Sequence, residues 1–404
     1  MKIATLLFTY NRSYHTGQVL DALKKNTVLP QKLFVFQDGL KKEKDADEWN
    51  KVNTLIHDID WCDNEVIVSK HNRGLADAII SGIDYVFQEY DAIIVLEDDC
   101  IPHRGFMTFM TNCLYKYEDK KEVFSASGYA YPVEIEGNGS DAYFTRRISS
   151  WGWGTWKDRW AYYERDYRIL GRIMNTPELA KQFHIWGEDL ECHLRGNIYG
   201  SCNSWAVFWA LTVIEQKGYC LSCYKSLINN IGFDGTGVHS GNQEFIQRLY
   251  EKDECNFRLP DEIELPDECE QAFADFFSWT PPEKRMDLYN DFLMKWVDYA
   301  TNRQFRLADR LVEKGIEKCS IWGKGKICDL LLKELQGEIE VLSIIESYPV
   351  QQEYRGIPIV DIYHIPEESQ LIIVIPIHDF AKIERTVDKV IECELISLEK
   401  ILEI

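Results

Sequence analysis

The chain has 404 residues, of which 45% are hydrophobic and 27% are charged, and its formal net charge is −21. This length predicts two or three domains with their own hydrophobic cores. The negative charge argues against nucleic acid as a partner, because nucleic-acid binding needs a basic surface. It leaves room for one local cationic site that takes a phosphorylated ligand.

The N-terminal segment MKIATLLFTYNR holds a short apolar run that polar residues end. Such a run is too short for a signal peptide, and no window approaches a transmembrane helix. We therefore expect a cytoplasmic protein, with contact to the inner face of the cell membrane through its acceptor as an open alternative. The twelve cysteines are scattered, and one CxxC pair without a second pair favours reduced structural thiols over a zinc site.

Four unbroken apolar runs in the first hundred residues each end at a polar stop. The stops are Thr9-Tyr10-Asn11-Arg12, Gln37-Asp38-Gly39, Lys70-His71-Asn72-Arg73-Gly74 and Glu97-Asp98-Asp99. Unbroken runs are typical of strands covered on both faces. Helical patterns lie between them, and the clearest places on one apolar face Leu75, Ile79, Gly82, Ile83 and Val86. This alternation predicts a parallel sheet whose carboxyl edge gathers all four stops.

The regular alternation of strands and helices ends at residue 123, and strand-like segments and tryptophan-rich loops follow. An acidic stretch at 253–270 precedes helical patterns at 284–315, and alternating strands and helices return after 316. We predict an α/β domain at 1–250, an acidic and helical linker at 251–315, and a small Rossmann-like α/β domain at 316–404.

The last domain contains the segment WGKGKIC between a predicted strand and a predicted helix. Cys328 stands where a dinucleotide fingerprint has its third glycine, although Glu346 lies at a workable acidic position. A docking or regulatory role is therefore favoured over nucleotide binding for this domain.

Glu97, Asp98 and Asp99 place three like charges at the end of a buried strand, with no Lys or Arg inside the motif. Neighbouring carboxylates repel by about 1 kcal/mol in water at 4 Å, and more where the dielectric falls. Hard oxygen ligands on such a loop suit Mg²⁺ or Mn²⁺ bridging to a diphosphate, and the alternative is a solvated turn. The position at the sheet edge favours the metal.

Arg12 and Arg73 are the natural counterparts of these acids, because each follows a predicted strand and could hold phosphate oxygens. Gly74 opens a helix whose N-terminal N–H groups favour an anion. Asp38 could accept hydrogen bonds from a base edge, or simply cap a turn. The alternatives for all four are surface residues and ordinary turns, and only their grouping favours function.

Further along, SSWGWGTWKDRW holds four tryptophans, whose flat faces suit sugar rings although Trp is more often partly buried core. We expect one or two of the four to contact a ligand, with Trp153 as the first choice. Asp189 stands at a predicted helix start, where it is a candidate general base or a helix-dipole charge. His239, in a glycine-rich loop, is a further metal ligand or an incidental loop residue.

With these residues assembled, the first 250 or so residues resemble a GT-A-fold glycosyltransferase. The segments FTYNR, QDG, HNRGLADAIISGI and IIVLEDD match the nucleotide-binding half of that fold. SSWGWGTWKDRW and NNIGFDGTGVHSG are similar to segments of bacterial polysaccharide and surface-glycan transferases, related to family 2 transferases and to the branching N-acetylglucosaminyltransferases.

The resemblance implies a hexosyl- or N-acetylhexosaminyltransferase that moves a sugar, with inversion, from a nucleotide donor, most often UDP-linked, to a hydroxyl. The acceptor would be a glycan, lipid-linked or protein-linked. Asp38 would meet the base, Arg73 the diphosphate and Asp99 the Mn²⁺ or Mg²⁺, with His239 as a second ligand. The further donor contacts would be Thr9, Asn11, Arg12, Gly74, Glu97 and Asp98, and the sugar or acceptor contacts Trp153, Asn203 and Trp205.

The chain departs from that family at NSWAVFW, where Asn203 replaces an Asp and Phe208 an Arg. Asn cannot take a proton, so Asp189 becomes the candidate base. Three other functions stay open: a sugar nucleotidylyltransferase, a haloacid-dehalogenase-like phosphatase, and a catalytically impaired domain that only binds. The first would normally need a glycine-rich basic loop where this chain has TYNRSYH, and the second an Asp pair after the first strand. A homo-oligomer is also an open expectation.

Overall fold

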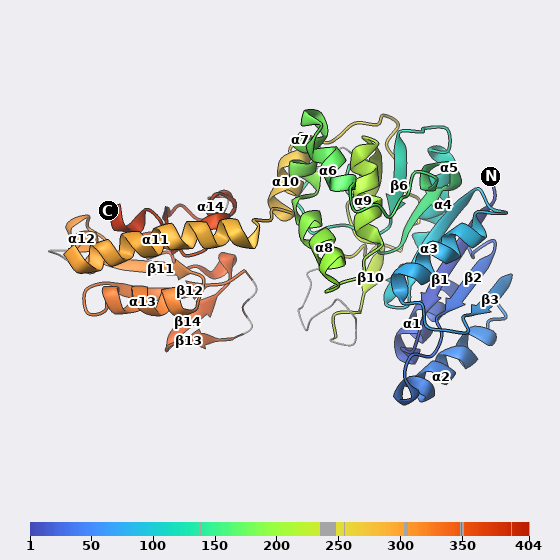
Figure 1. The fold of residues 1–404 in the computed structure, drawn as a ribbon, viewed down its shortest axis with the longest axis horizontal. Helices are drawn as coiled ribbons and strands as arrows, with labels where there is room; N and C mark the ends of the chain where they lie inside the picture. Colours follow the sequence, from blue (N-terminus) through green and yellow to red (C-terminus); the bar gives the residue numbers. More distant parts are fainter. Residues whose placement is uncertain are drawn as a thin grey trace. The chain divides into compact units, whose positions relative to one another are not determined.

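The computed structural model describes residues 1–137, 139–234, 248–253, 255–302, 306–347, 349, 351–388 and 390–403. They form two compact units, Met1–Trp279 and Thr280–Ile404. Figure 1 labels their elements. The division differs from the predicted boundaries at 250 and 316. The acidic stretch adds Leu259 to the core of the first unit, and the long helix after it packs Phe292 and Trp296 into the core of the second.

Strands and helices alternate in the first unit from Ile3 to Glu97. In chain order they are β1 (Ile3–Thr9), α1 (Ser13–Lys24), β2 (Leu33–Gln37), α2 (Ala46–His57), β3 (Asn64–Val68), α3 (Leu75–Val86), β4 (Ala92–Glu97), β5 (Cys100–Pro102) and α4 (Phe106–Lys116). Next come β6 (Val123–Ser127), β7 (Ala142–Thr145), β8 (Trp153–Trp156), α5 (Lys157–Trp160), α6 (Ile169–Met174), α7 (Pro177–Trp186), α8 (Glu188–Tyr199), α9 (Ala206–Glu215), β9 (Tyr219–Cys223), β10 (Ile228–Asn230) and α10 (Cys269–Phe276).

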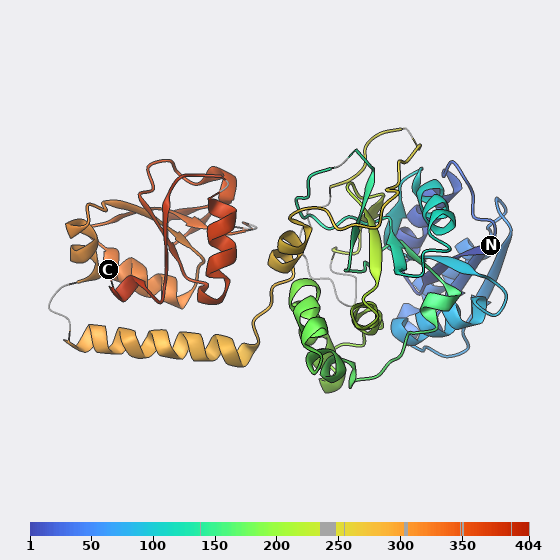
Figure 2. The same ribbon diagram turned by 90° about the horizontal axis from the view of Figure 1, so that it is seen from above.

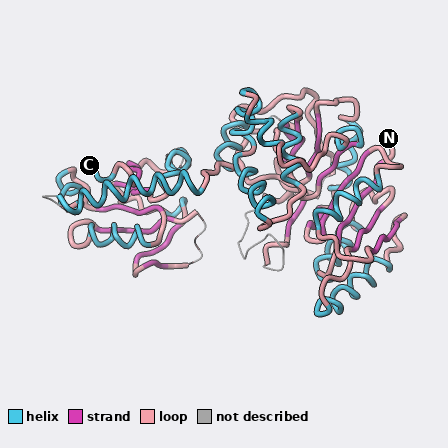
Figure 3. Tube along the Cα trace, in the orientation of Figure 1, coloured by secondary structure: helices cyan, strands magenta, loops and turns pink. Residues whose placement is uncertain are grey.

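An eight-stranded sheet of order β3-β2-β1-β4-β8-β6-β9-β7 forms the centre of this unit. The first four strands are mutually parallel, β8 runs antiparallel to β4 and β6, and β7 runs antiparallel to β9. The predicted α/β class, a mostly parallel sheet flanked by helices, is confirmed. Figure 3 shows the strands of each unit as an inner layer between helices.

Both faces of the sheet are buried, which explains the unbroken apolar runs. In β1, the side chains of Ala4, Leu6 and Phe8 pack in the core that includes α3 and α6 to α9, while Ile3 and Leu7 pack with α1, α2 and α4. Figure 2 gives a second view of these layers. One detail of α3 was predicted wrongly, because Leu75 is 41% exposed instead of belonging to the buried face.

The second unit begins with a long helix that lies within the predicted linker. Its elements are α11 (Pro282–Asn302), α12 (Leu307–Glu313), β11 (Lys318–Trp322), α13 (Lys326–Leu335), β12 (Glu340–Ile345), β13 (Glu353–Tyr354), β14 (Ile357–Val360), β15 (Leu371–Val374), α14 (Phe380–Val387) and β16 (Glu394–Ser397). The sheet order is β13-β14-β12-β11-β15-β16, parallel except for the β13–β14 pair. A small α/β domain at the end of the chain is confirmed. Cys328 is fully buried in its core.

No helix among the described residues is both long and apolar enough to cross a membrane. All twelve cysteines carry free thiols, and most of these are buried or half-buried.

Candidate functional site

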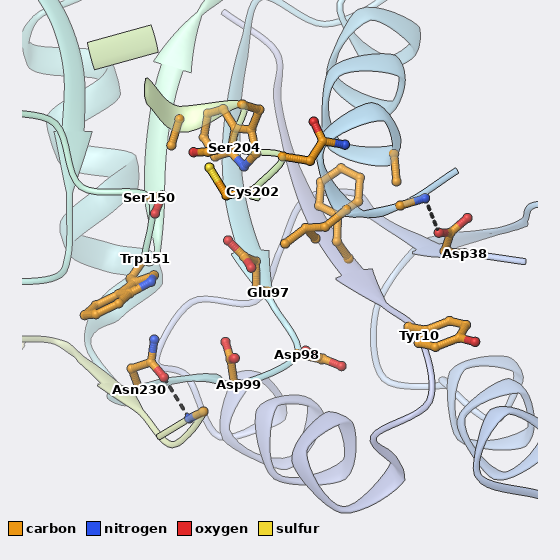
Figure 4. A pocket seen from close by; sticks show the side chains of 18 of the residues that line it. Tyr10, Asp38, Glu97, Asp98, Asp99, Ser150, Trp151, Cys202, Ser204 and Asn230 are labelled. Carbon is orange, nitrogen blue, oxygen red and sulfur yellow. Dashed lines mark hydrogen bonds between the residues drawn. The ribbon is translucent and has the colours of Figure 1, made fainter. Parts of the chain in front are cut away.

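A cavity of about 660 Å³ opens at the carboxyl edge of the first sheet. Its walls come from the ends of β1, β2 and β4, the first turn of α3, the segment before β8, the α8–α9 loop and the loop after β10. Figure 4 shows Tyr10, Asp38, Glu97, Trp151 and Asn230 around this space. The predicted gathering of polar stops is observed here, since the stops after β1, β2 and β4 and Gly74 all contribute.

The acidic triplet lines one side of the cavity, and Arg12 offsets its charge. The Arg12 guanidinium donates to both carboxylates that follow β4: Nε lies 3.3 Å from Asp98 Oδ2 and Nη2 lies 2.8 Å from Asp99 Oδ2. Nη2 also donates to Asp98 Oδ1. Arg12 was expected to bind phosphate, but the structure places it on the acids, 86 and 87 residues away in the chain.

Glu97 is not part of this ion-paired group. Its carboxyl lines the cavity and accepts no hydrogen bond from the described residues, and Figure 4 shows it between Asp99 and Ser204. Burial, followed by the charges of Asp99 and Asp98, raises the pKa of Glu97 to about 8, while Arg12 acts in the opposite direction. Burial also raises the pKa of Asp98, again against Arg12. The triplet holds more negative charge than Arg12 neutralises.

Asp99 is the residue of the triplet best placed for a divalent ion. Arg12 contacts its Oδ2, and among the described residues its Oδ1 accepts only a weak 3.5 Å contact from the Cys100 thiol. A Cβ at Gly232 would lie 2.3 Å from Asp99 Oδ2, so the glycine makes room for this carboxylate. Excess carboxylate charge and hard oxygen donors fit Mg²⁺ or Mn²⁺, which take one or two protein carboxylates plus phosphate oxygens and water.

No group of three or more His, Cys, Asp or Glu side chains in the described part of the chain is arranged to hold a metal. His239, the second predicted ligand, lies outside the described residues. Among the described residues, Asp99 is the side chain that would hold such a metal, together with oxygens of the bound ligand.

Asp38 organises the turn before α3 instead of presenting free oxygens to the cavity. Its carboxylate accepts from the backbone N–H groups of Gly39 at 2.8 Å, Arg73 at 2.9 and 3.1 Å, and Gly74 at 2.9 Å. Gly74 has φ +77°, a conformation that glycine adopts without strain, and lines the cavity. The Arg73 side chain is exposed, donates to Ser81 Oγ at 3.1 Å and is not among the lining residues. The turn is at the site, but its arginine points elsewhere.

Thr9 and Asn11 line the cavity as predicted for the stop after β1. The Thr9 hydroxyl donates to the Phe36 carbonyl oxygen at 3.3 Å, so it also holds β1 to β2. Tyr10, which the sequence reading left aside, lines the same wall, and its hydroxyl donates to Asp45 at 3.1 Å.

The tryptophan segment contributes Trp151, not Trp153. Trp153 is 0% exposed and stacks on Trp205 with ring centroids 5.1 Å apart, so the expectation that it contacts a ligand is corrected. Its place opposite Val95 in the β8–β4 pairing turns it into the core. Trp151 precedes β8 and lines the cavity, with its ring edge-on to Tyr129 and Phe233. Trp205 lines the cavity while remaining mostly buried.

Asp189 lies in the first turn of α8, but both of its oxygens are held by Arg147. Nη1 lies 2.8 Å from Oδ1 and Nη2 lies 2.7 Å from Oδ2. Arg147 lines the cavity, whereas Asp189 does not. Sequence reading missed Arg147 because it is an isolated residue in a loop, and no local pattern marks it.

Asn203 lines the cavity from the α8–α9 loop, together with Cys202 and Ser204. Its amide oxygen accepts a hydrogen bond from Nη2 of Arg165. The Arg165 guanidinium lies over the Phe208 ring, 5.6 Å from its centroid. Arg165, from a distant part of the chain, therefore contacts Phe208.

Comparisons with known proteins give structural likeness only. No family model matches the chain, and no curated protein matches it. The mannosyltransferase PcManGT from Pyrobaculum calidifontis, solved with GDP-Man and Mn²⁺, is similar over 53% of this chain and 69% of its own, with 9% identity and a TM-score of 0.32. S. aureus TarS is similar over 58% of this chain and 37% of its own, with 10% identity and a TM-score of 0.33.

An apo UDP-glucose pyrophosphorylase is similar over 55% of this chain and 90% of its own, with 12% identity and a TM-score of 0.29. For TarS, the aligned part covers 37% of that chain, which is well under two thirds of its length. Identities and TM-scores of this size leave the activity to be inferred from the site itself.

Proposed function

We propose that the first unit is a metal-dependent glycosyltransferase that moves a sugar from a nucleotide donor to an acceptor hydroxyl. The observation that carries the proposal is the pairing, within one cavity, of the acidic triplet with the glycine-opened turn of α3. A diphosphate fits between a carboxylate-bound cation and a helix N-terminus. The aromatic wall at Trp151 suits a sugar ring.

Each residue of the site has a proposed role in binding the metal or the donor. Asp99 would hold a Mn²⁺ or Mg²⁺ ion, which neutralises a departing diphosphate when bound. Asp38 keeps the Arg73–Gly74 turn in the shape that presents its backbone to the donor. Arg12 holds Asp98 and Asp99 in place, and through them the metal end of the cavity. Stabilisation of developing charge in a pre-arranged site is usually the largest catalytic contribution.

In the reaction, the acceptor oxygen loses its proton and bonds to the anomeric carbon, while the bond from that carbon to the phosphate oxygen breaks. The configuration inverts and the nucleoside diphosphate leaves with the electron pair. Two carboxyls compete to accept the proton. Asp189 would first have to leave Arg147, whereas Glu97 already faces the cavity without a hydrogen-bond partner among the described residues. The geometry favours Glu97, which can accept the proton in its ionised form, the main form above its raised pKa of about 8. Amide exchange at each position distinguishes the two carboxyls.

The finer assignment follows the resemblance. We propose a UDP-linked hexosyl or N-acetylhexosaminyl donor and a glycan, lipid-linked or protein-linked acceptor, in the synthesis of bacterial surface polysaccharide or glycoconjugate. The enzyme would work in the cytoplasm, at the inner membrane face where the acceptor is lipid-linked. Self-association is a further proposal, which size-exclusion chromatography with light scattering tests directly.

The decisive experiment incubates the full chain with a panel of UDP- and GDP-sugars, with and without Mn²⁺, and identifies the released product. Nucleoside diphosphate released only with Mn²⁺, and lost in Asp99→Asn, supports the proposal. Pyrophosphate-dependent chemistry in place of diphosphate release would indicate a nucleotidylyltransferase. Mn²⁺-dependent binding by thermal shift without any turnover would indicate a binding module.

A further inference from the structure

Asn72 lines the cavity at the end that meets the nucleoside in the proposed function. The sugar and the nucleoside are attached at opposite ends of the diphosphate, and the wall at Trp151 is the one proposed for the sugar. Figure 4 shows Asp38 and Tyr10 across the space from Trp151. Asn72 stands two residues before Gly74, on the Asp38 side. The base of a bound nucleotide therefore lies among Asp38, Tyr10 and Asn72.

Two polar groups at this end already have all or most of their hydrogen bonds within the protein. The Asp38 carboxylate accepts from backbone N–H groups of the turn at 2.8, 2.9, 2.9 and 3.1 Å. A carboxylate has about four lone-pair sites, so these contacts fill it. The Tyr10 hydroxyl donates to Asp45 at 3.1 Å and accepts from the Lys41 backbone N–H at 3.0 Å. Neither side chain is left to read the edge of a base.

The Asn72 amide, in contrast, is held at its nitrogen alone. Its Nδ2 donates to the Gly39 carbonyl oxygen at 2.9 Å. If the amide turned over, its oxygen would face that carbonyl oxygen, and neither atom can donate. The two loops are also closely packed, because a Cβ at Gly39 would lie 2.3 Å from the His71 carbonyl carbon. The orientation of the amide is therefore fixed, with Oδ1 turned away from Gly39.

The amide oxygen of Asn72 accepts from no described residue. Asn11 is a second amide that lines the cavity, but it makes no hydrogen bond to the described residues, so nothing fixes which of its ends meets a ligand. An acceptor held in place before binding loses less conformational freedom when the ligand arrives. Asn72 thus offers the base a pre-oriented hydrogen-bond acceptor.

We infer that Asn72 is a specificity-determining residue whose Oδ1 accepts a hydrogen bond from the ring N–H of the donor's base, which is N3–H in uracil and N1–H in guanine. The inference rests on the proposed function, and it assigns the reading of the base to Asn72 in place of Asp38. Cytosine and adenine carry a lone pair at the equivalent ring nitrogen, which repels the amide oxygen. A site built to accept an N–H disfavours analogues that lack it.

The test is a calorimetric titration of the full chain, in Mn²⁺, with UDP, GDP and their ring-methylated forms, 3-methyluridine diphosphate and 1-methylguanosine diphosphate. For the diphosphate that wild type prefers, methylation should weaken binding about tenfold, because it replaces the donated hydrogen. In Asn72→Ala, the two forms should bind within about twofold of each other. An amide that only held the loop would lower both affinities equally and leave their ratio unchanged.

Two variants serve as controls. Asn50→Ala removes an exposed amide on α2 that does not line the cavity, and it should keep the wild-type ratio. Asn11→Ala removes the other amide of the cavity wall and should keep the ratio as well. In both, the preference for the unmethylated base then depends on Asn72 alone among these three residues.

A second readout follows the base itself. With the preferred diphosphate labelled with ¹⁵N at the ring N–H, the imino proton should be protected from exchange in the wild-type complex and exposed in saturated Asn72→Ala. The inference is overturned, and the proposed function stands, if wild type binds the methylated and parent forms equally, if Asn72→Ala keeps the wild-type ratio, or if Asn11→Ala loses it. If wild type binds neither UDP nor GDP in Mn²⁺, the proposed function fails and the inference falls with it.

Discussion

Arg147 and Asp189 form a two-pronged ion pair in which the exposed fraction is 8% for the arginine side chain and 21% for the aspartate side chain. Arg147 also donates to the Trp186 carbonyl oxygen at 2.9 Å and lies 3.9 Å from the centroid of the Phe277 ring. The Asp189 carboxylate therefore fixes the buried Arg147 guanidinium. We expect the first role of Asp189 to be the positioning of Arg147 at the cavity wall.

Asp189→Asn should lower the free energy of unfolding by about 3 kcal/mol, because it leaves a buried guanidinium without its charged partner. Urea denaturation measures this. The double change Arg147→Met with Asp189→Leu should recover much of the loss, since an apolar pair of similar volume often replaces a buried ion pair without penalty. Glu178→Gln, which removes an exposed partner of Lys217, is the control and should leave the midpoint unchanged. A normally stable Asp189→Asn that had lost all turnover would instead identify Asp189 as the base.

Arg12→Met should destabilise the first unit in metal-free buffer by about 3 kcal/mol, because Asp98 and Asp99 then lose the cation that faces them. Mn²⁺ should restore more stability to this variant than it adds to wild type, since it supplies the missing positive charge. Thermal unfolding with and without MnCl₂ provides the comparison. Arg104→Met, at an exposed pair with Asp253, controls for the loss of an arginine. An equal Mn²⁺ effect in the two variants would argue against a metal at Asp99.

The strands and the sheet edge could be predicted from the sequence because burial on both faces leaves a direct record, an unbroken apolar run that stops at polar residues. The Asp38 turn and the acidic triplet were predicted for the same reason. Their partners were not. Arg12 follows β1 and Asp98 follows β4, and only the pairing of these two strands shows that the arginine can neutralise the aspartate.

The direction of several side chains also could not be predicted from the sequence. Along a strand, every second residue faces the same way, so the sequence alone could not show which of Trp151 and Trp153 faces the cavity. The bounds of β8 and the pairing of Val95 with Trp153 were needed to place them. Arg147 and Arg165 lie in irregular segments, where no periodicity reports direction. Each acts through a partner about forty residues away, Asp189 and Asn203 respectively, and such pairs leave no mark in a single sequence.

Gly232→Ala should weaken Mn²⁺-dependent nucleotide binding about tenfold or more while leaving the fold intact. The new Cβ would lie 2.3 Å from Asp99 Oδ2 and 3.0 Å from its Cγ, so the carboxylate has to move out of its position. The displaced oxygen also accepts from Arg12 Nη2, so part of the folding free energy is lost together with the binding. Calorimetry with UDP or GDP in Mn²⁺ measures the effect. Gly171→Ala in α6, where a Cβ meets nothing within 4 Å, is the matched control and should add up to about 1 kcal/mol of stability.

Substitutions at the two tryptophans should have different effects: those at Trp153 should lower stability, and that at Trp151 should weaken ligand binding. Trp153→Ala should cost about 3–5 kcal/mol of unfolding free energy, because the side chain is 0% exposed and packs with Trp160, Trp205 and Trp209. Trp153→Phe should cost less, since the Trp153 indole N–H has no hydrogen-bond partner among the described residues and its loss carries no penalty.

Trp151→Ala should instead keep most of the stability and weaken binding of the sugar nucleotide, because the ring that lines the cavity is removed. Urea denaturation and calorimetry on the same three preparations give both quantities. The reverse pattern, with Trp151→Ala unfolding easily and Trp153→Phe losing ligand at normal stability, would mean that the ligand reaches the tryptophan predicted from the sequence, and that the cavity wall rearranges when it binds.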